Sequence, residues 1–271
     1  MTTAWLRFLF LLALVSAATA AHALVFAVNE GVTYRVTNDE IRAKYAVVAA
    51  DLGKILRQPV TIEPIADYPT LRKGLAAREY DLAFVHPAHL SVLAIRDSGY
   101  HLLAVTKGYQ KYTASFLVRA DSTAKTLTDL KDGAVGAPDE DSITAWMVRA
   151  SLRDSFGGTP PLRYFYTRFQ DAVPFFVDNG LTKSSATASE GVVKAWLAKG
   201  GRVLARSKPV PIKHMLASPS LSADQVLKVR EYLVGLDGSE EGKKKLESIK
   251  YEGFAPHSEA DILAIGKWLG L

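Results

Sequence analysis

Cysteine is absent from the 271 residues of this sequence. Disulfide bonds, thiolate nucleophiles and cysteine-based metal sites are therefore excluded. A chain of this length can bury enough apolar surface to fold without such cross-links. We expect its stability to come from the hydrophobic core, even in an oxidising compartment.

Long hydrophobic runs are also scarce. The apolar run over residues 8–15 follows Arg7 and is too short to span a bilayer. Small residues come next, and residues 21–23 read Ala-His-Ala, the A-x-A form that signal peptidase recognises. We therefore predict a signal peptide over residues 1–23, which is cleaved to leave a periplasmic chain that starts at Leu24. A retained membrane anchor is the alternative interpretation.

Positive charge is not concentrated in any long stretch. The formal net charge is +5, and Lys and Arg are scattered along the chain. The one dense basic run, residues 243–245, is flanked by glutamates, which indicates a solvated helix face. This distribution does not indicate a nucleic-acid partner. It permits an anionic ligand without identifying one.

Motifs of catalysis are missing as well. The sequence contains no G-x-S-x-G elbow, no P-loop and no H-E-x-x-H pair. The histidines at positions 86 and 89 have no evident third partner, so they do not make a metal site. We therefore expect a protein that is not an enzyme and that carries no cofactor and no metal.

What the sequence does contain is an alternation of strand and helix patterns. Thr37 and Glu40 form a capping-box pattern at the start of the first helix, and Tyr45 lies on its apolar face. Further helices are expected over residues 69–77 and 87–96, and strands over residues 24–28, 60–65, 81–85 and 102–106. Such alternation predicts an α/β fold with mainly parallel sheets flanked by helices.

The pattern restarts at Tyr112. Strands are expected over residues 112–119, 134–137, 162–166 and 184–188, and helices begin at 141–142 and at about 170, with C-terminal helices over 223–236 and 258–269. The restart predicts two lobes, formed by residues 24–110 with 213–271 and by residues 111–212. Open α/β sheets bind ligands beyond the carboxyl ends of their strands, so we expect a ligand cleft between the lobes.

Three parts of the sequence resemble one family, the periplasmic phosphate-, phosphite- and phosphonate-binding components of ABC transporters, which are type II periplasmic binding proteins. They are D-Y-P-T-L at 67–71 with Y-D-L-A-F-V-H-P-A at 80–88, residues 112–122 with L-T-D-L-K-D-G at 127–133, and S-P-S-L at 218–221 with G-F-A-P at 253–256. The resemblance spans nearly the whole mature chain. It implies a monomeric solute-binding protein that captures a small oxyanion for an ABC permease.

The resemblance also implies which residues bind the ligand. Two cleft tyrosines of the family fall on Tyr68 and Tyr112. The family's anion-binding turn falls on residues 138–144, where Ser142 and Thr144 are the candidate donors. A helix N-terminus suits an oxyanion because unpaired N–H groups and the positive end of the helix dipole lie there.

The sequence departs from the family in that turn. Asp139, Glu140 and Asp141 would repel a dianion unless they face solvent or pair with Lys or Arg. If Asp141 faces the cleft, a neutral, cationic or protonated ligand becomes the expectation. Asp141 and Ser142 could also serve only as helix caps. His86 replaces a family glycine, and we interpret it as a neutral hydrogen-bonding residue of the cleft.

Two further interpretations bear on function. Trp146, one turn into the same helix, is interpreted as a packing residue. A second functional class shares the ligand cleft: a periplasmic sensory accessory protein that presents its ligand-bound form to a membrane sensor kinase or cyclase. The sequence alone does not separate this role from that of an importer component.

Overall fold

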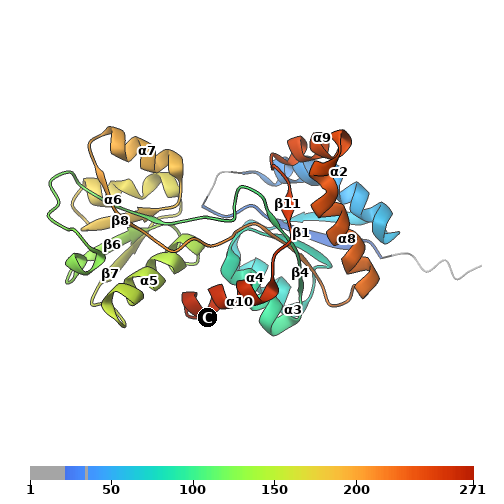
Figure 1. The fold of residues 1–271 in the computed structure, drawn as a ribbon, viewed down its shortest axis with the longest axis horizontal. Helices are drawn as coiled ribbons and strands as arrows, with labels where there is room; N and C mark the ends of the chain where they lie inside the picture. The colour runs from blue at the N-terminus through green and yellow to red at the C-terminus, as the bar shows by residue number, and fades with distance from the viewer. Residues whose placement is uncertain (1–21, 34–35) are drawn as a thin grey trace, which may run out of the picture.

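The computed structural model describes residues 22–33 and 36–271 as two α/β lobes side by side (Figure 1). The predicted signal peptide, residues 1–23, lies outside the described residues except for its last two positions. None of the helices within the described ranges has the length and apolar character needed to cross a bilayer.

The first lobe is built on a six-stranded sheet of order β11-β4-β10-β3-β1-β2. β1 to β4 point the same way, while β10 is antiparallel to β3 and β4, and β11 is antiparallel to β4. The strands are β1 Leu24–Asn29, β2 Val60–Pro64, β3 Leu82–Val85, β4 His101–Thr106, β10 His214–Ala217 and β11 Phe254–Ala255. The helices are α2 Asn38–Leu56, α3 Tyr68–Ala77, α4 Ala88–Ser98, α8 Ala223–Gly235, α9 Glu240–Ile249 and α10 Glu259–Leu269, with the short turn η3 Leu236–Gly238.

Both faces of this sheet are covered, and β3 shows why its sequence is apolar throughout. Leu82 and Phe84 pack in one core cluster with α2 and α8. Ala83 and Val85 pack in the other cluster with α3 and α4. Successive side chains of a strand point to opposite faces, so a strand that is buried on both sides must be apolar at every position.

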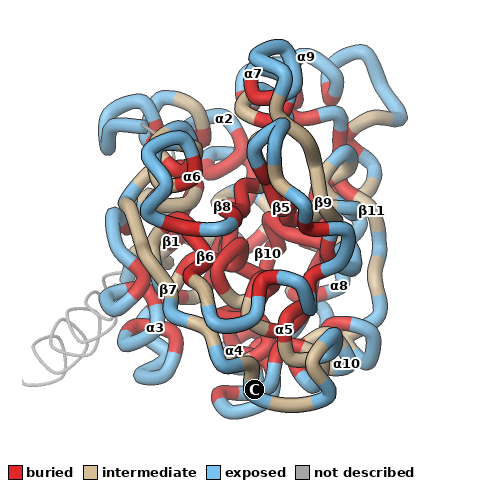
Figure 2. The backbone as a smooth tube through the Cα atoms, turned by 90° about the vertical axis from the view of Figure 1, so that its left-hand side faces the viewer, coloured by how far each residue is buried: buried red, intermediate tan, exposed pale blue. Residues whose placement is uncertain are grey.

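The second lobe has a five-stranded sheet of order β7-β6-β8-β5-β9, in which β6 is parallel to β7 and β8 while β5 is antiparallel to β8 and β9. Viewed from the second lobe, the central strands β5, β6 and β8 are buried, while the edge strands β7 and β9 are mainly half-buried (Figure 2). The strands are β5 Ser115–Val118, β6 Ala134–Ala137, β7 Arg163–Tyr166, β8 Ser184–Thr187 and β9 Arg202–Arg206. The helices are α5 Ile143–Phe156, α6 Pro174–Asp178 and α7 Glu190–Ala198, with turns η1 Leu127–Leu130 and η2 Gln170–Ala172.

Local sequence signals set the helix ends. The capping box predicted for α2 is confirmed: the N–H of Glu40 donates to the Thr37 hydroxyl at 3.2 Å, and the N–H of Thr37 donates to the Glu40 carboxylate at 2.7 Å. α5 starts after Ser142, whose hydroxyl accepts from the N–H of Ala145 at 3.1 Å. It ends at Gly157, which adopts the left-handed conformation with φ of 68°.

Several element predictions were wrong in extent. The strand expected over residues 112–119 is only β5, because Tyr112 lies on the segment between the lobes and makes an isolated bridge with Val210. The helix expected from residue 87 begins at Ala88, with Pro87 as its N-cap. The helix expected from about residue 170 is divided into η2 and α6. No strand was predicted where β9, β10 and β11 lie, and α7 was not predicted.

Two crossovers of the chain connect the lobes, and one helix packs against both lobes. The two crossovers pair where the N–H groups of Tyr112 and Val210 donate to each other's carbonyl, at 3.0 and 2.9 Å. The helix is α10, at the C-terminal end of the chain, which packs on α4 of the first lobe and on α5 of the second. The strands of the first sheet come from residues 24–106 and 214–255, and those of the second sheet come from residues 115–206. Lobe boundaries near residues 110 and 213 stay a prediction.

Candidate ligand-binding cleft

A cavity of about 950 Å³ lies between the two lobes. The first lobe contributes the segments that follow β1 and β2, and the second lobe contributes those that follow β6 and β7 together with the start of α5. These are carboxyl ends of parallel strands, where ligands of open α/β sheets bind. The lining residues are Val32, Ala66, Asp67, Tyr68, Pro69, Asp139, Glu140, Asp141, Trp146, Arg149, Tyr166, Thr167 and Arg168.

Tyr68 forms part of the first lobe's wall. It is the first residue of α3, whose N-cap Asp67 accepts from the N–H of Thr70 at 2.7 Å. The Tyr68 side chain is almost completely buried, and its hydroxyl accepts from the N–H of Val32 at 3.3 Å. The ring is therefore held in place at the cavity before any ligand arrives.

The turn before α5 presents its carboxylates, and not its hydroxyls, to the cavity. Asp139, Glu140 and Asp141 line the cavity, whereas Ser142 and Thr144 are not among its lining residues. Both hydroxyl residues are buried. The Ser142 oxygen caps α5, and the Thr144 oxygen accepts from the side-chain amide of Gln170 at 2.9 Å.

Asp141 forms an ion pair with Arg72 of α3, with distances of 3.0 and 3.1 Å from Nη2 to the two carboxylate oxygens. The pair joins the lobes across the cavity. A second link is the N–H of Gln170, which donates to the carbonyl of Thr33 at 3.4 Å. The negative charge of Asp141 is thus balanced by an arginine.

Arg149 brings positive charge to the same wall. Its Nη1 donates to the carbonyl of Glu140 at 3.0 Å and to the hydroxyl of Tyr166 at 3.1 Å. Its guanidinium lies 4.6 Å from the centre of the Trp146 ring. The sequence analysis did not identify Arg149, Tyr166 or Arg168. The spacing of Trp146 and Arg149, three residues apart on one helix face, was the available signal.

Trp146 does pack, as interpreted, but it also lines the cavity. Its ring stacks on His89 of α4, with ring centres 5.4 Å apart and an interplanar angle of 30°. Because α4 belongs to the first lobe and α5 to the second, this contact also crosses between the lobes.

His86 and Tyr112 meet each other next to the crossovers and are not among the cavity-lining residues. Their ring centres are 6.1 Å apart at 83°. Burial is the main cause that lowers the pKa of His86 to about 3, and the charge of Lys213 lowers it further. His86 is therefore neutral at physiological pH. The structure brings Tyr68 and Asp141 together at the cavity and places Tyr112 and His86 beside it.

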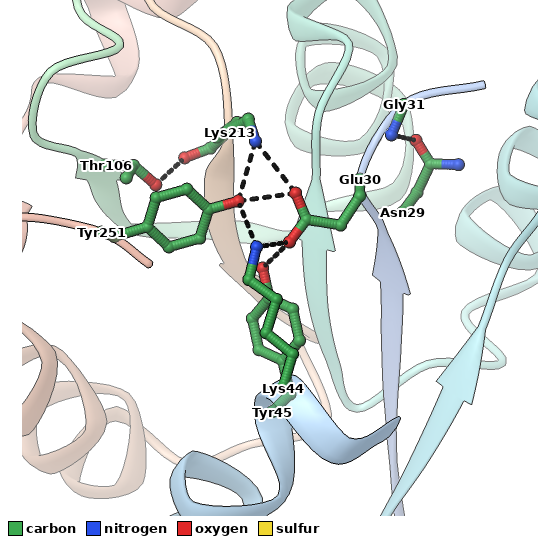
Figure 3. A network of polar contacts seen from close by, with 8 residues as sticks. All are labelled: Asn29, Glu30, Gly31, Lys44, Tyr45, Thr106, Lys213 and Tyr251. Carbon is green, nitrogen blue, oxygen red and sulfur yellow. Dashed lines mark hydrogen bonds and ion pairs between the residues drawn. The ribbon is translucent and has the colours of Figure 1, made fainter. Parts of the chain in front are cut away.

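A buried polar network lies just beyond the end of β1 (Figure 3). One carboxylate oxygen of Glu30 accepts from Lys44 at 2.5 Å and from the Tyr45 hydroxyl at 2.6 Å. The other accepts from Lys213 at 2.9 Å and from the Tyr251 hydroxyl at 2.6 Å. Lys213 ends the crossover that returns to the first lobe, so this network anchors the crossover. Tyr45 is in the core as expected, with a polar role that the sequence did not indicate.

No group of three or more His, Cys, Asp or Glu side chains in residues 22–33 and 36–271 is arranged to hold a metal ion. The cavity lining offers two arginines, one of them beside aromatic rings, the turn that leads into α5, and four acidic residues, of which Asp141 is paired with an arginine. The arginines among these groups suit the binding of an anion.

Comparison with known proteins identifies a matching family model. The family model described as the periplasmic substrate-binding protein of phosphonate ABC transporters matches residues 31–262. No curated protein matches the chain significantly.

Solved structures share the fold at low sequence identity. A Xanthomonas citri protein bound to ATP aligns with a TM-score of 0.73 and 15% identity, over 92% of this chain and 98% of the other. PhnD1 from Prochlorococcus marinus, in complex with methylphosphonate, aligns with a TM-score of 0.68 and 14% identity, over 91% and 96%. A binding protein component of a Pseudomonas aeruginosa ABC phosphonate transporter aligns with a TM-score of 0.62 and 17% identity, over 91% and 85%. The two-lobed α/β fold class predicted from the sequence is confirmed.

Proposed function

This chain belongs to the family of periplasmic substrate-binding proteins of phosphonate ABC transporters, and from that premise we propose that it captures a phosphonate- or phosphate-like oxyanion between its lobes. Members of this family are binding components and not enzymes, and they work with an ABC permease. We further propose that the chain is exported as a monomer and loses residues 1–23.

The observation that carries the proposal is the composition of the cavity. Both lobes line it, so a ligand inside would touch both and favour their closure. Arg149 and Arg168 supply positive charge, and the carboxylate of Asp141 is balanced by Arg72. Methylphosphonate and ATP, the ligands of two structural relatives, both carry phosphorus oxyanions, which supports the same class of ligand here.

We place the anion between the start of α5 and Tyr68. The first turn of α5 offers backbone N–H groups and the positive end of the helix dipole. Tyr68 faces it from the other lobe, and Tyr112 with His86 supports the site from the crossovers. On closure, the ligand-bound form would present a single surface made of both lobes to the permease.

Calorimetry on the chain from Leu24 onward tests this proposal, with methylphosphonate, phosphite, phosphate and sulfate as probes. Tyr68→Ala and Tyr112→Ala should each weaken binding by about 1–3 kcal/mol, the range for a lost hydrogen-bond partner. Tyr232→Phe is the control, because its hydroxyl bonds to Asp51 in the first lobe, away from the cavity lining. The proposal fails if none of the four anions binds to the unaltered protein. Intact mass of exported material reports on cleavage before Leu24.

A further inference from the structure

Arg149 is held in position by neutral partners. Its contacts are the Glu140 carbonyl, the Tyr166 hydroxyl and the Trp146 ring. Among the residues that the structure describes, it forms no ion pair with a carboxylate. Neutral partners fix the direction of the guanidinium without neutralising its charge, so the group is pre-organised for an anionic partner.

Most of the nearby carboxylates have partners other than Arg149. Asp67 accepts from the N–H and the hydroxyl of Thr70. Asp139 accepts from the N–H of Asp141 at 2.9 Å, and Asp141 itself is paired with Arg72. Three of the four acidic residues on the cavity wall are therefore engaged with groups other than Arg149.

The hydroxyl residues of the turn are not among the residues that line the cavity. Ser142 caps α5 and Thr144 accepts from Gln170, and both are buried behind the turn. Arg149, about one and a half turns further along α5, does line the cavity and brings a positive charge to its wall. A guanidinium also presents parallel N–H donors that match two oxygens on one centre, which a hydroxyl cannot do.

The Trp146 ring connects this arginine with the first lobe. His89, on which it stacks, is fully buried in α4, and neither ring nitrogen has a hydrogen-bond partner within the described part of the chain. Tyr68 also contacts His89, with ring centres 6.2 Å apart. An apolar stack of this kind forms only while α4 and α5 are in contact, that is, while the lobes are together.

We propose that Arg149 is the anion-binding residue of the cleft, that it grips two oxygens of a tetrahedral oxyanion, and that the Trp146–His89 stack positions it and couples anion binding to lobe closure. This inference rests on the proposed function and assigns its charge recognition to one side chain. It predicts that the ligand class is set by a guanidinium and requires at least two oxygens on one centre.

The test uses the chain from Leu24 onward with methylphosphonate and inorganic phosphate as probes. Arg149→Gln should weaken binding of both by about 10- to 150-fold, the range for a hydrogen-bonded charged group. Arg149→Lys keeps the charge but loses the parallel donors, so it should recover only part of that loss. Arg163→Gln, which removes an exposed arginine from β7 of the same lobe, is the matched control and should stay within about twofold of the parent.

Closure is followed separately through tryptophan fluorescence. The mature chain has tryptophans at 146, 196 and 268. Methylphosphonate should change the emission of the parent protein, and Trp146→Phe should abolish most of that change. His89→Leu removes the ring stack but keeps an apolar contact, so it should weaken methylphosphonate binding less than Arg149→Gln does and should reduce the change in Trp146 emission.

Three results would overturn the inference. Arg149→Gln could bind methylphosphonate within threefold of the parent, Arg163→Gln could lose as much affinity as Arg149→Gln, or Arg149→Lys could match the parent in full. Circular dichroism of each variant excludes misfolding as the cause of lost binding, and the Lys variant retains the charge should the Gln variant fail to fold. If the parent binds neither probe, the proposed function fails first and the inference with it.

Discussion

Replacement of Glu30 with Gln is the sharpest test of how the first lobe holds the crossovers. The carboxylate accepts four hydrogen bonds inside the protein, from Lys44, Tyr45, Lys213 and Tyr251 (Figure 3). An amide of the same shape can accept only at its oxygen, and its NH₂ group would face lysine ammonium groups. The variant leaves two buried positive charges without their counter-charge.

The magnitude follows from the pKa of Glu30. Burial alone would raise this pKa, but the charges of Lys213 and Lys44, together with hydrogen bonds from Lys44 and Tyr251, lower it from 4.5 to about 2. That difference corresponds to about 3 kcal/mol of preference for the ionised form in the folded state. Loss of one partner from a buried ion pair costs about 3–5 kcal/mol. We therefore expect Glu30→Gln to lower the free energy of unfolding by about 3–5 kcal/mol at pH 7.

The sign of the pH dependence supplies a second check. Because the pKa is depressed in the folded state, the stabilisation is complete above about pH 5 and is lost as the pH falls toward 2. The difference in unfolding free energy between parent and variant should therefore shrink over that window.

Urea denaturation followed by circular dichroism measures both effects. Glu63→Gln, on the exposed face of β2, is the matched control and should change the free energy of unfolding by less than about 0.5 kcal/mol. A loss below about 1 kcal/mol for Glu30→Gln at pH 7 would refute the reasoning. So would a difference between parent and variant that stays constant down to pH 2.

Three further changes test other parts of the structure. Ser142→Ala removes the α5 cap and should lower the free energy of unfolding, measured in urea, by about 1 kcal/mol. Its affinity for methylphosphonate should fall far less than that of Arg149→Gln. A large loss of affinity would indicate that the Ser142 hydroxyl binds the ligand. A double-mutant cycle with Arg72→Gln and Asp141→Asn should give a coupling in unfolding free energy of about 0.2–1 kcal/mol, since both side chains are partly exposed. A coupling of zero in low salt would show that this ion pair does not stabilise the contact between the lobes. Burial lowers the pKa of His86 and His214 to about 3, so the free energy of unfolding should fall as the pH drops from about 6.5 toward 3. His214→Leu should make this pH dependence weaker. An unchanged pH dependence would contradict a buried, neutral His214.

The sequence alone was sufficient for the features that depend on residues close together in the chain. Thr37 and Glu40 make their reciprocal cap three residues apart, as their spacing predicted. The alternation of strands and helices identified the fold class, because a strand buried on both faces and an amphipathic helix each leave a local pattern. Tyr68, which the family resemblance implied as a cleft residue, does line the cavity.

Only the tertiary structure decided the details of the site. β10 lies between β3 and β4 although it comes far later in the chain, and no local pattern encodes which strands become neighbours. The pairing of Asp141 with Arg72 joins different lobes, so the sequence left the direction of that carboxylate open. The carbonyl, hydroxyl and ring that surround Arg149 come from other segments, and the direction in which the Ser142 hydroxyl caps its helix was likewise not visible in the sequence. Side-chain directions of this kind depend on contacts between distant segments, and these exist only once the two lobes have folded against each other.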